Sequence, residues 1–87
     1  MTTFFKLCVK AYPDLMEQFE DLFFTLEEKE ILASRLAIIK ELLDGKLSQR
    51  EISKKLHTSI SKITRGSNAL KAANKQFVSL LKGELYE

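Results

Sequence analysis

The chain of 87 residues contains no tryptophan and has only one cysteine, one histidine, one proline and three glycines. A single cysteine, Cys8, excludes an internal disulfide, and one Cys with one His gives no ligand spacing for zinc. No apolar run approaches the roughly 18 residues of a membrane span, and residues 1–10 lack the basic segment and apolar core of a secretory signal. We therefore expect a cytoplasmic protein with no metal site and no membrane partner.

Catalytic groups are missing from the sequence as well. No carboxylates cluster near Cys8 or His57, so neither residue can be assigned to a nucleophile–base pair. We interpret His57 as an exposed turn residue and Cys8 as a small core residue. The sequence therefore predicts a protein that is not an enzyme.

The charge that is present is strongly polarised along the chain, although the total is only +2. Residues 46–75 contain eight Lys or Arg and a single acid, Glu51, which is a net charge of +7. The remaining residues carry six bases and eleven acids, a net charge of −5. This distribution is typical of a polyanion-binding surface on an acidic body. An ordinary solvated basic face is the alternative interpretation.

Helical periodicity runs through the chain, and no stretch shows sustained alternation of apolar and polar residues. We predict a single all-α domain over residues 1–87, with six helices at about residues 3–12, 14–23, 25–44, 48–56, 60–72 and after 74. Thr25 and Ser48, each followed three residues later by a glutamate, predict capping boxes, and Gly45 predicts a left-handed helix end. The third helix has an apolar stripe of Ile31, Leu32, Leu36, Ile39, Leu42 and Leu43. A chain this short with 45% apolar residues favours oligomerisation.

Two short capped helices joined by His57-Thr58-Ser59 predict a helix-turn-helix unit in residues 46–73, called here the head. An ordinary corner between two helices gives the same pattern. A helical wheel of the second helix places Ile63, Ser67 and Leu70 toward the core, with short polar or amide side chains and a lysine on the opposite arc. Side chains of that kind reach base edges and phosphates in DNA.

A third arc of the second helix holds Arg65, Gly66 and Ala69, called here the shelf because two small residues lie beside a planar cation. A glycine in mid-helix costs about 1 kcal/mol against alanine, so it indicates a close approach. Periodicity alone favours packing clearance for Gly66 and a phosphate contact for Arg65. Arg35, among apolar neighbours in the third helix, fits either a structural ion pair or the wall of a ligand pocket.

The shelf belongs to a specific string of residues. ITRGSNALKAA at residues 63–73, together with SQRE at 48–51 and ELLDG at 41–45, closely resembles the bacterial tryptophan (Trp) operon repressor family. The resemblance runs without a gap from about Thr25 to Ala73.

The resemblance implies an intertwined homodimer of six-helix chains. Residues 1–45 and 74–87 would form the shared dimerisation core, and two-fold symmetry would present two heads to a pseudo-palindromic operator in double-stranded DNA. L-tryptophan is the corepressor that the family binds, and no other cofactor is implied.

The same resemblance assigns a tryptophan pocket to the shelf. Arg65 corresponds to the arginine that pairs with the ligand carboxylate, Arg35 to the one that covers the other face of the indole, and Thr25 to the polar end. The implied tryptophan-binding residues are Leu22 and Phe24 (through their carbonyls), Thr25, Arg35, Arg65, Gly66 and Ala69. Ala69 stands where the family has a serine hydroxyl, which removes one hydrogen bond worth about 0.5–1.5 kcal/mol.

The DNA-binding residues implied by the family lie in both helices of the head: Gln49, Arg50, Ile60, Thr64, Asn68 and Lys71. Lys54 and Lys55 add a sequence-independent attraction that weakens with salt. Ser61 and Lys62 replace smaller or neutral residues, which alters operator preference or adds a phosphate contact. The turn at residues 57–59 replaces a small, glycine-containing one, which stiffens the hinge.

The leading interpretation is a sequence-specific repressor that L-tryptophan activates, controlling genes of tryptophan biosynthesis or uptake and associated with the bacterial nucleoid when bound. One alternative is a ligand-independent helix-turn-helix regulator with the same fold, which Ala69 and the altered turn favour. The other is a helical protein-interaction module whose basic face meets an acidic partner. A salt-sensitive but sequence-indifferent DNA affinity would favour this last reading.

Overall fold

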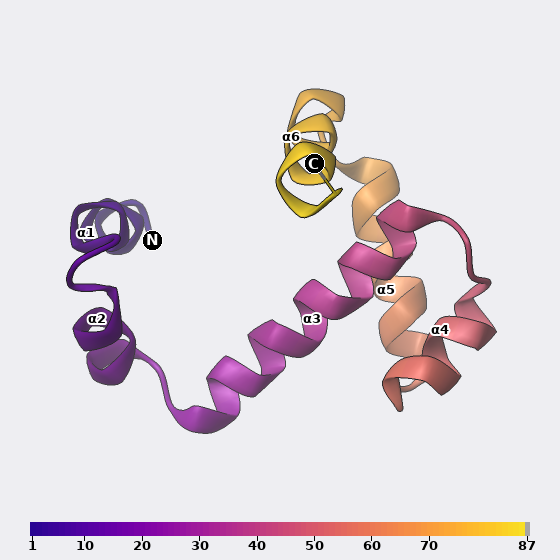
Figure 1. The fold of residues 1–87 in the computed structure, drawn as a ribbon, viewed down its shortest axis with the longest axis horizontal. Helices are drawn as coiled ribbons and strands as arrows, with labels where there is room; N and C mark the ends of the chain where they lie inside the picture. The colour runs from indigo at the N-terminus through magenta and orange to yellow at the C-terminus, as the bar shows by residue number, and fades with distance from the viewer. Residues whose placement is uncertain (87) are drawn as a thin grey trace. The chain divides into compact units, whose positions relative to one another are not determined.

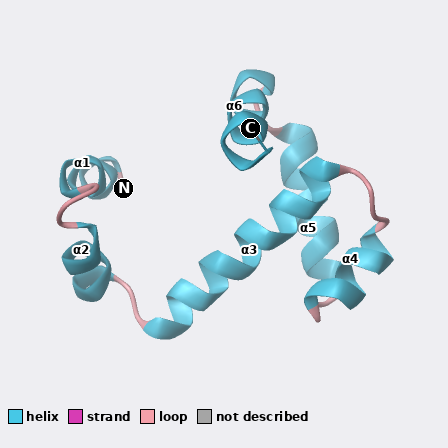
Figure 2. Cartoon of the chain, viewed as in Figure 1, coloured by secondary structure: helices cyan, strands magenta, loops and turns pink. Residues whose placement is uncertain are grey.

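A computed structural model describes residues 1–86, and every regular element within them is a helix (Figure 1). The elements are α1 (Thr2–Ala11), α2 (Met16–Phe23), α3 (Leu26–Asp44), α4 (Gln49–Leu56), α5 (Ile60–Ala72) and α6 (Lys75–Tyr86). Figure 2 shows that short loops connect them. The predicted all-α fold of six helices is therefore confirmed for the described residues. The chain forms two compact units, the first ending at Ile31 and the second beginning at Leu32.

Phenylalanine rings hold the first unit together. The ring centroid of Phe4 in α1 lies 5.1 Å from that of Phe19, 5.3 Å from that of Phe23 and 5.9 Å from that of Phe24. Tilted and edge-to-face pairs at these distances add about 0.5–1.5 kcal/mol each beyond the burial of area. Phe19 is buried at the centre of the cluster, which fixes α1 against α2.

The second helix begins later than predicted. The sequence predicted a start at Asp14, whereas α2 starts at Met16 because residues 12–15 form a turn. Tyr12 is extended (φ −76°, ψ 139°), the conformation that a following proline imposes, and it ends α1. The N–H of Leu15 then donates to the carbonyl of Ala11 at 2.8 Å and closes the turn. Pro13 therefore lies in this turn and not in the first turn of α2.

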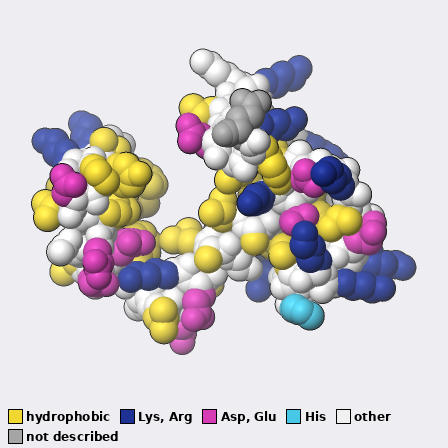
Figure 3. All heavy atoms as spheres, in the orientation of Figure 1, with side chains coloured by type: hydrophobic (Ala, Val, Ile, Leu, Met, Phe, Trp, Pro, Cys, Tyr) yellow, Lys and Arg dark blue, Asp and Glu magenta, His cyan; other side chains and the backbone are white. Residues whose placement is uncertain are grey.

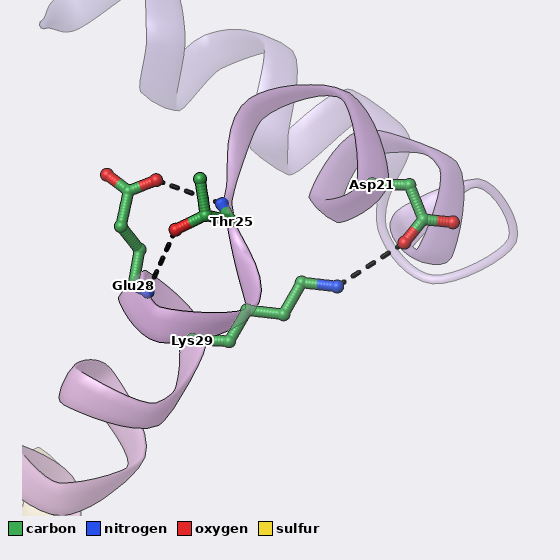
Figure 4. A network of polar contacts seen from close by, with 4 residues as sticks. All are labelled: Asp21, Thr25, Glu28 and Lys29. Carbon is green, nitrogen blue, oxygen red and sulfur yellow. Dashed lines mark hydrogen bonds and ion pairs between the residues drawn. The ribbon is translucent and has the colours of Figure 1, made fainter.

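Both predicted capping boxes are formed. At the start of α3, the N–H of Glu28 donates to Thr25 Oγ1 at 3.1 Å, and the N–H of Thr25 donates to Glu28 Oε1 at 2.9 Å (Figure 4). Ser48 and Glu51 make the same pair of bonds, at 3.1 and 2.9 Å, at the start of α4. Gly45 lies between the two helices with φ +72°, the left-handed conformation predicted for it. Local signals therefore determine where α3 and α4 begin.

Three isoleucines, one each from α3, α4 and α5, form the core of the second unit. Ile52 and Ile63 are fully buried and Ile38 is 4% exposed, with Leu42, Leu47 and Leu56 packed against them. Burial of one such side chain contributes about 1.5–3 kcal/mol. The predicted inward direction of Ile63 is confirmed, whereas Ile38 was not in the predicted stripe of α3.

The end of α6 contacts α3 within the same unit. The hydroxyl of Tyr86 donates a hydrogen bond to the carbonyl of Lys40, and Lys40 Nζ lies 5.9 Å from the centroid of the Tyr86 ring. Asn74 Oδ1 accepts from the N–H of Phe77 at 3.1 Å and caps the start of α6.

The turn of the head ends α4 with His57 in the left-handed conformation (φ 53°, ψ 47°). The N–H groups of His57 and Thr58 both donate to the carbonyl of Ser53, and Ser53 Oγ donates to the carbonyl of Thr58 at 2.5 Å. Ser59 then caps α5 by accepting from the N–H of Lys62 at 3.3 Å. Glycine is the usual residue at such a helix end, so histidine carries the steric cost of a Cβ.

We expect His57→Gly to raise the free energy of unfolding by up to about 1 kcal/mol, because glycine adopts φ 53° without a Cβ contact. His57→Val should lower it by about 1 kcal/mol, because a β-branched residue is disfavoured further in this region. Denaturant unfolding of both variants measures the effect, and His57→Ala serves as the control for loss of the imidazole. A shift of both variants in the same direction would contradict this account of the turn.

Candidate ligand and nucleic-acid interface

The outward face of α5 carries side chains predicted to contact DNA. Six of them are exposed on this helix: Ile60, Ser61, Lys62, Thr64, Asn68 and Lys71. The preceding helix adds Arg50 and Lys54, which are exposed, and Gln49, which is half-buried. The helical wheel therefore predicted the exposure of this arc correctly.

One hydrogen bond joins the two helices of the head at this surface. The hydroxyl of Thr64 donates to Gln49 Oε1 at 2.8 Å. Because the amide oxygen is used in this bond, the NH₂ group of Gln49 is oriented and remains able to donate. Donors at the start of a helix are well placed for a phosphate. The sequence predicted a DNA contact for each of the two residues. It did not predict the bond between them, because they are 15 positions apart.

Basic side chains surround the head. In Figure 3 Lys and Arg side chains (dark blue) project around α4 and α5 with a few acidic side chains (magenta) among them, and further acidic side chains gather over α2 and the start of α3. Lys55 differs from the prediction of a free charge, because its Nζ lies 2.7 Å from Glu41 Oε1 in α3. That hydrogen bond, followed by the charge of Glu41, raises the pKa of Lys55. Part of its positive charge is therefore offset within the molecule.

The shelf combines a packing contact with two exposed side chains. A Cβ on Gly66 would lie 3.1 Å from Ile38 Cγ2 and 3.3 Å from Leu42 Cδ1, both in α3. Gly66 therefore lets α5 approach α3 closely, which is the packing role that periodicity favoured. Arg65 and Ala69 are exposed beside this contact. These two side chains are accessible to a small molecule, whereas Gly66 has no side chain to contact one.

Other residues of the predicted ligand set lie near the start of α3. Leu22 belongs to the last turn of α2, Phe24 follows that helix, and Thr25 caps α3. Carbonyls in the last turn of a helix lack partners within it, and the helix dipole is negative there, so that end favours an ammonium group. Arg35 is exposed on α3 and takes part in neither ion pair found in residues 1–86, contrary to the structural ion-pair alternative.

Residues 1–86 hold no group of three or more His, Cys, Asp or Glu that is arranged to bind a metal ion. Cys8 is a free, half-buried thiol in α1, and His57 is exposed in the turn. None of the described helices has both the length and the apolar character that a membrane crossing requires.

The capping box of α4 makes part of the stability depend on pH. The backbone N–H of Ser48 and then its hydroxyl lower the pKa of Glu51 below the ordinary value. Because the folded state has the lower pKa, the carboxylate stabilises the fold above the pKa of the unfolded chain. This contribution is lost as the pH falls through the folded pKa.

We expect Glu51→Gln, which keeps an acceptor but removes the charge, to unfold at a lower temperature than the wild type at about pH 7. The difference should shrink as the pH falls through the folded pKa of Glu51, because the carboxyl group is then protonated in the folded state as well. Thermal unfolding followed by circular dichroism at several pH values measures it. A difference that stays constant with pH would show that the charge is not involved.

Comparison with known proteins gives one consistent result. The family described as Trp repressor protein matches residues 1–85, well beyond the segment that carries the resemblance in the sequence. A Trp operon repressor homolog of Chlamydia caviae is 48% identical over 80 residues, which cover 91% of this chain and 79% of the relative. A homolog of Chlamydia trachomatis serovar L2 is 43% identical over 83 residues, covering 94% and 88%. One of Histophilus somni is 40% identical over 83 residues, covering 94% and 78%.

Proposed function

This chain belongs to the Trp repressor family, and from that premise we propose that it represses transcription by binding operator DNA when L-tryptophan is bound as corepressor. The single observation that supports this most is the division of α5, whose outward arc is polar and exposed while Gly66 packs on α3 beside the exposed Arg65. One short helix thus offers a DNA surface and a ligand surface. We assign its targets to genes of tryptophan biosynthesis or uptake, and its place to the cytoplasm, on the nucleoid when bound.

We assign the DNA contacts by chemistry. Arg50, Lys54, Lys62 and Lys71 neutralise phosphates, because they are exposed cations in the segment that holds the net charge of +7. The short side chains of α5 face the base edges: Ile60, Ser61, Thr64 and Asn68. Gln49 donates to a phosphate with the amide group that Thr64 orients.

We assign the ligand contacts to the two ends of the amino acid and to its ring. Arg65 pairs with the carboxylate, since an exposed guanidinium forms two parallel hydrogen bonds with such a group. The carbonyls of Leu22 and Phe24, with Thr25, receive the ammonium group, as the negative end of a helix favours. Arg35 covers a face of the indole. A ligand that binds the DNA-competent arrangement better raises DNA affinity, and DNA raises ligand affinity by the same factor.

A homodimer is the proposed assembly, with residues 1–45 and 74–87 as the shared core and residues 46–73 as the head of each copy. Large apolar side chains of α1 to α3 are exposed in the single chain, among them Leu22 at 77%, Val9 at 75% and Leu26 at 72%. Ile31, Leu32, Leu36, Phe77 and Leu80 are exposed as well. Apolar surface on this scale marks an interface, whereas Ile52 and Ile63 of the head are already buried.

A ligand-independent regulator with the same fold is the second candidate. Ala69 favours it, because its side chain offers no hydrogen bond to an amino acid. The closed turn after α4, with its left-handed His57, favours it too, since a rigid head needs less ordering by a ligand. Operator binding with and without L-tryptophan separates the two candidates.

We expect L-tryptophan to raise the affinity for a pseudo-palindromic operator, selected from random DNA with this protein, by a factor of about 5–150. Fluorescence anisotropy at one fixed salt concentration measures it, with scrambled DNA of the same length as the control. Equal affinity with and without the amino acid would exclude the corepressor role and leave the second candidate. Equal affinity for both DNAs would instead support the interaction module.

We expect Arg65→Ala to weaken L-tryptophan binding by about 1.5–3 kcal/mol, because the carboxylate loses a charged partner. Ala69→Ser should strengthen binding by about 0.5–1.5 kcal/mol by supplying a hydroxyl. Isothermal titration calorimetry measures both, and Lys75→Ala, which removes a positive charge at the start of α6, is the control. Undiminished binding by Arg65→Ala would overturn the pocket assignment.

A further inference from the structure

An ion pair joins α3 to the head. Lys55 Nζ in α4 lies 2.7 Å from Glu41 Oε1 in α3. The Glu41 side chain is 18% exposed and that of Lys55 is 56% exposed, so the carboxylate sits at the edge of the packed region and the lysine reaches it from outside. Asp44, in the last turn of α3, also attracts Lys55. The DNA contacts assigned above do not use this pair.

Helix geometry explains why this lysine, and not its neighbour, reaches α3. Glu41 follows Ile38 by three positions and Lys55 follows Ile52 by three, so each charge lies on the same face as a buried isoleucine. The pair therefore flanks the apolar contact between α3 and α4. Lys54 follows Ile52 by two positions and projects from the opposite side of α4.

Apolar contacts are not directional, whereas an ion pair at their rim restricts rotation of one helix about the other. We propose that Glu41 and Lys55 are positioning residues: their ion pair holds α4 on α3 and sets the head for DNA without help from a ligand. This inference rests on the proposed DNA-binding function. The role of Lys55 is then to orient the head, and not to attract DNA through its charge.

The consequence follows from a two-state description of the head, docked on α3 or undocked. The ion pair and L-tryptophan both favour the docked state. Each therefore adds little to the docked population when the other alone already keeps the head docked. Loss of the pair therefore lowers DNA affinity without ligand and leaves the affinity at saturating ligand nearly unchanged. For a partly exposed pair we expect the ratio of the two affinities to rise about two- to fivefold.

The decisive comparison is Lys55→Gln against Lys54→Gln, since each removes one positive charge from α4. Lys54→Gln should lower operator affinity by the same factor with and without L-tryptophan, so the ratio of affinities stays at the wild-type value. Lys55→Gln should raise the ratio about two- to fivefold. Identical ratios for the two variants would overturn the proposal.

For Glu41→Gln, a simple charge effect and a positioning role predict opposite changes in the ligand-free affinity for DNA. Removal of a negative charge near DNA should strengthen binding if Glu41 acts only through its charge. A positioning role predicts weaker ligand-free binding instead, by about two- to fivefold. Tighter ligand-free binding by Glu41→Gln would contradict the positioning role.

Amide hydrogen exchange of α4, measured on the full chain without DNA or ligand, separates this proposal from the function it rests on. Exchange should be faster in Lys55→Gln and Glu41→Gln than in the wild type and Lys54→Gln, and no faster in the double variant than in either single one. If L-tryptophan has no effect on the wild type, the corepressor role fails and exchange alone decides about the ion pair. Equal exchange in all variants would overturn the ion pair as a positioning contact.

Discussion

The arrangement of the head depends on one apolar contact, in which Ile38 of α3, Ile52 of α4 and Ile63 of α5 meet in a small core. Because Ile63 faces inward, the polar side chains on the other side of α5 must face outward. Because Gly66 has no Cβ, α5 can approach α3 closely enough for that core to close. This contact sets the directions of α4 and α5, and the hydrogen bond from Thr64 to Gln49 then orients the amide assigned to DNA.

The head and the first three helices differ in how much of their apolar surface a single chain buries. The head buries Ile52 and Ile63 within a single chain, whereas α1 to α3 leave large side chains such as Val9 and Leu26 exposed. A chain of 87 residues buries only a modest fraction of its surface alone, and here the exposed apolar surface lies mainly on α1 to α3, where the proposed homodimer would cover it. The sequence separates the two signs of charge, with a net charge of +7 in residues 46–75 and −5 in the rest, so the head gathers positive charges whose mutual repulsion a bound polyanion relieves.

Local chemistry made most of the fold predictable. Ser48 with Glu51, Thr25 with Glu28, and the left-handed Gly45 set helix boundaries that depend on neighbours only three or four positions away. Pro13 misled the prediction of α2, because proline fits a turn as well as the first turn of a helix. Ile38 was missed because the apolar residues of α3 form a band too wide for periodicity to select one face. The fold class and the exposed arc of α5 needed no tertiary information.

What the sequence could not reveal are the contacts between helices. The bond from Thr64 to Gln49 and the ion pair of Lys55 with Glu41 join residues 15 and 14 positions apart, so they appear only once the isoleucine core has set the helix directions. The same limit applies to the shelf. Its residues could be picked out as unusual, but the neighbours of Gly66 could not be named before α3 was placed beside α5.

The close approach at Gly66 also divides α5 into a side packed on α3 and a side that is exposed. Any side chain at Gly66 would press on Ile38 and Leu42, whereas Ala69, one turn further, is exposed and has room for a larger residue. A larger side chain at position 69 therefore leaves the isoleucine core undisturbed, whereas one at position 66 requires Ile38 and Leu42 to shift by a few tenths of an ångström. The tolerance of α5 to substitution is thus set by its neighbour α3 and differs sharply between two positions one turn apart.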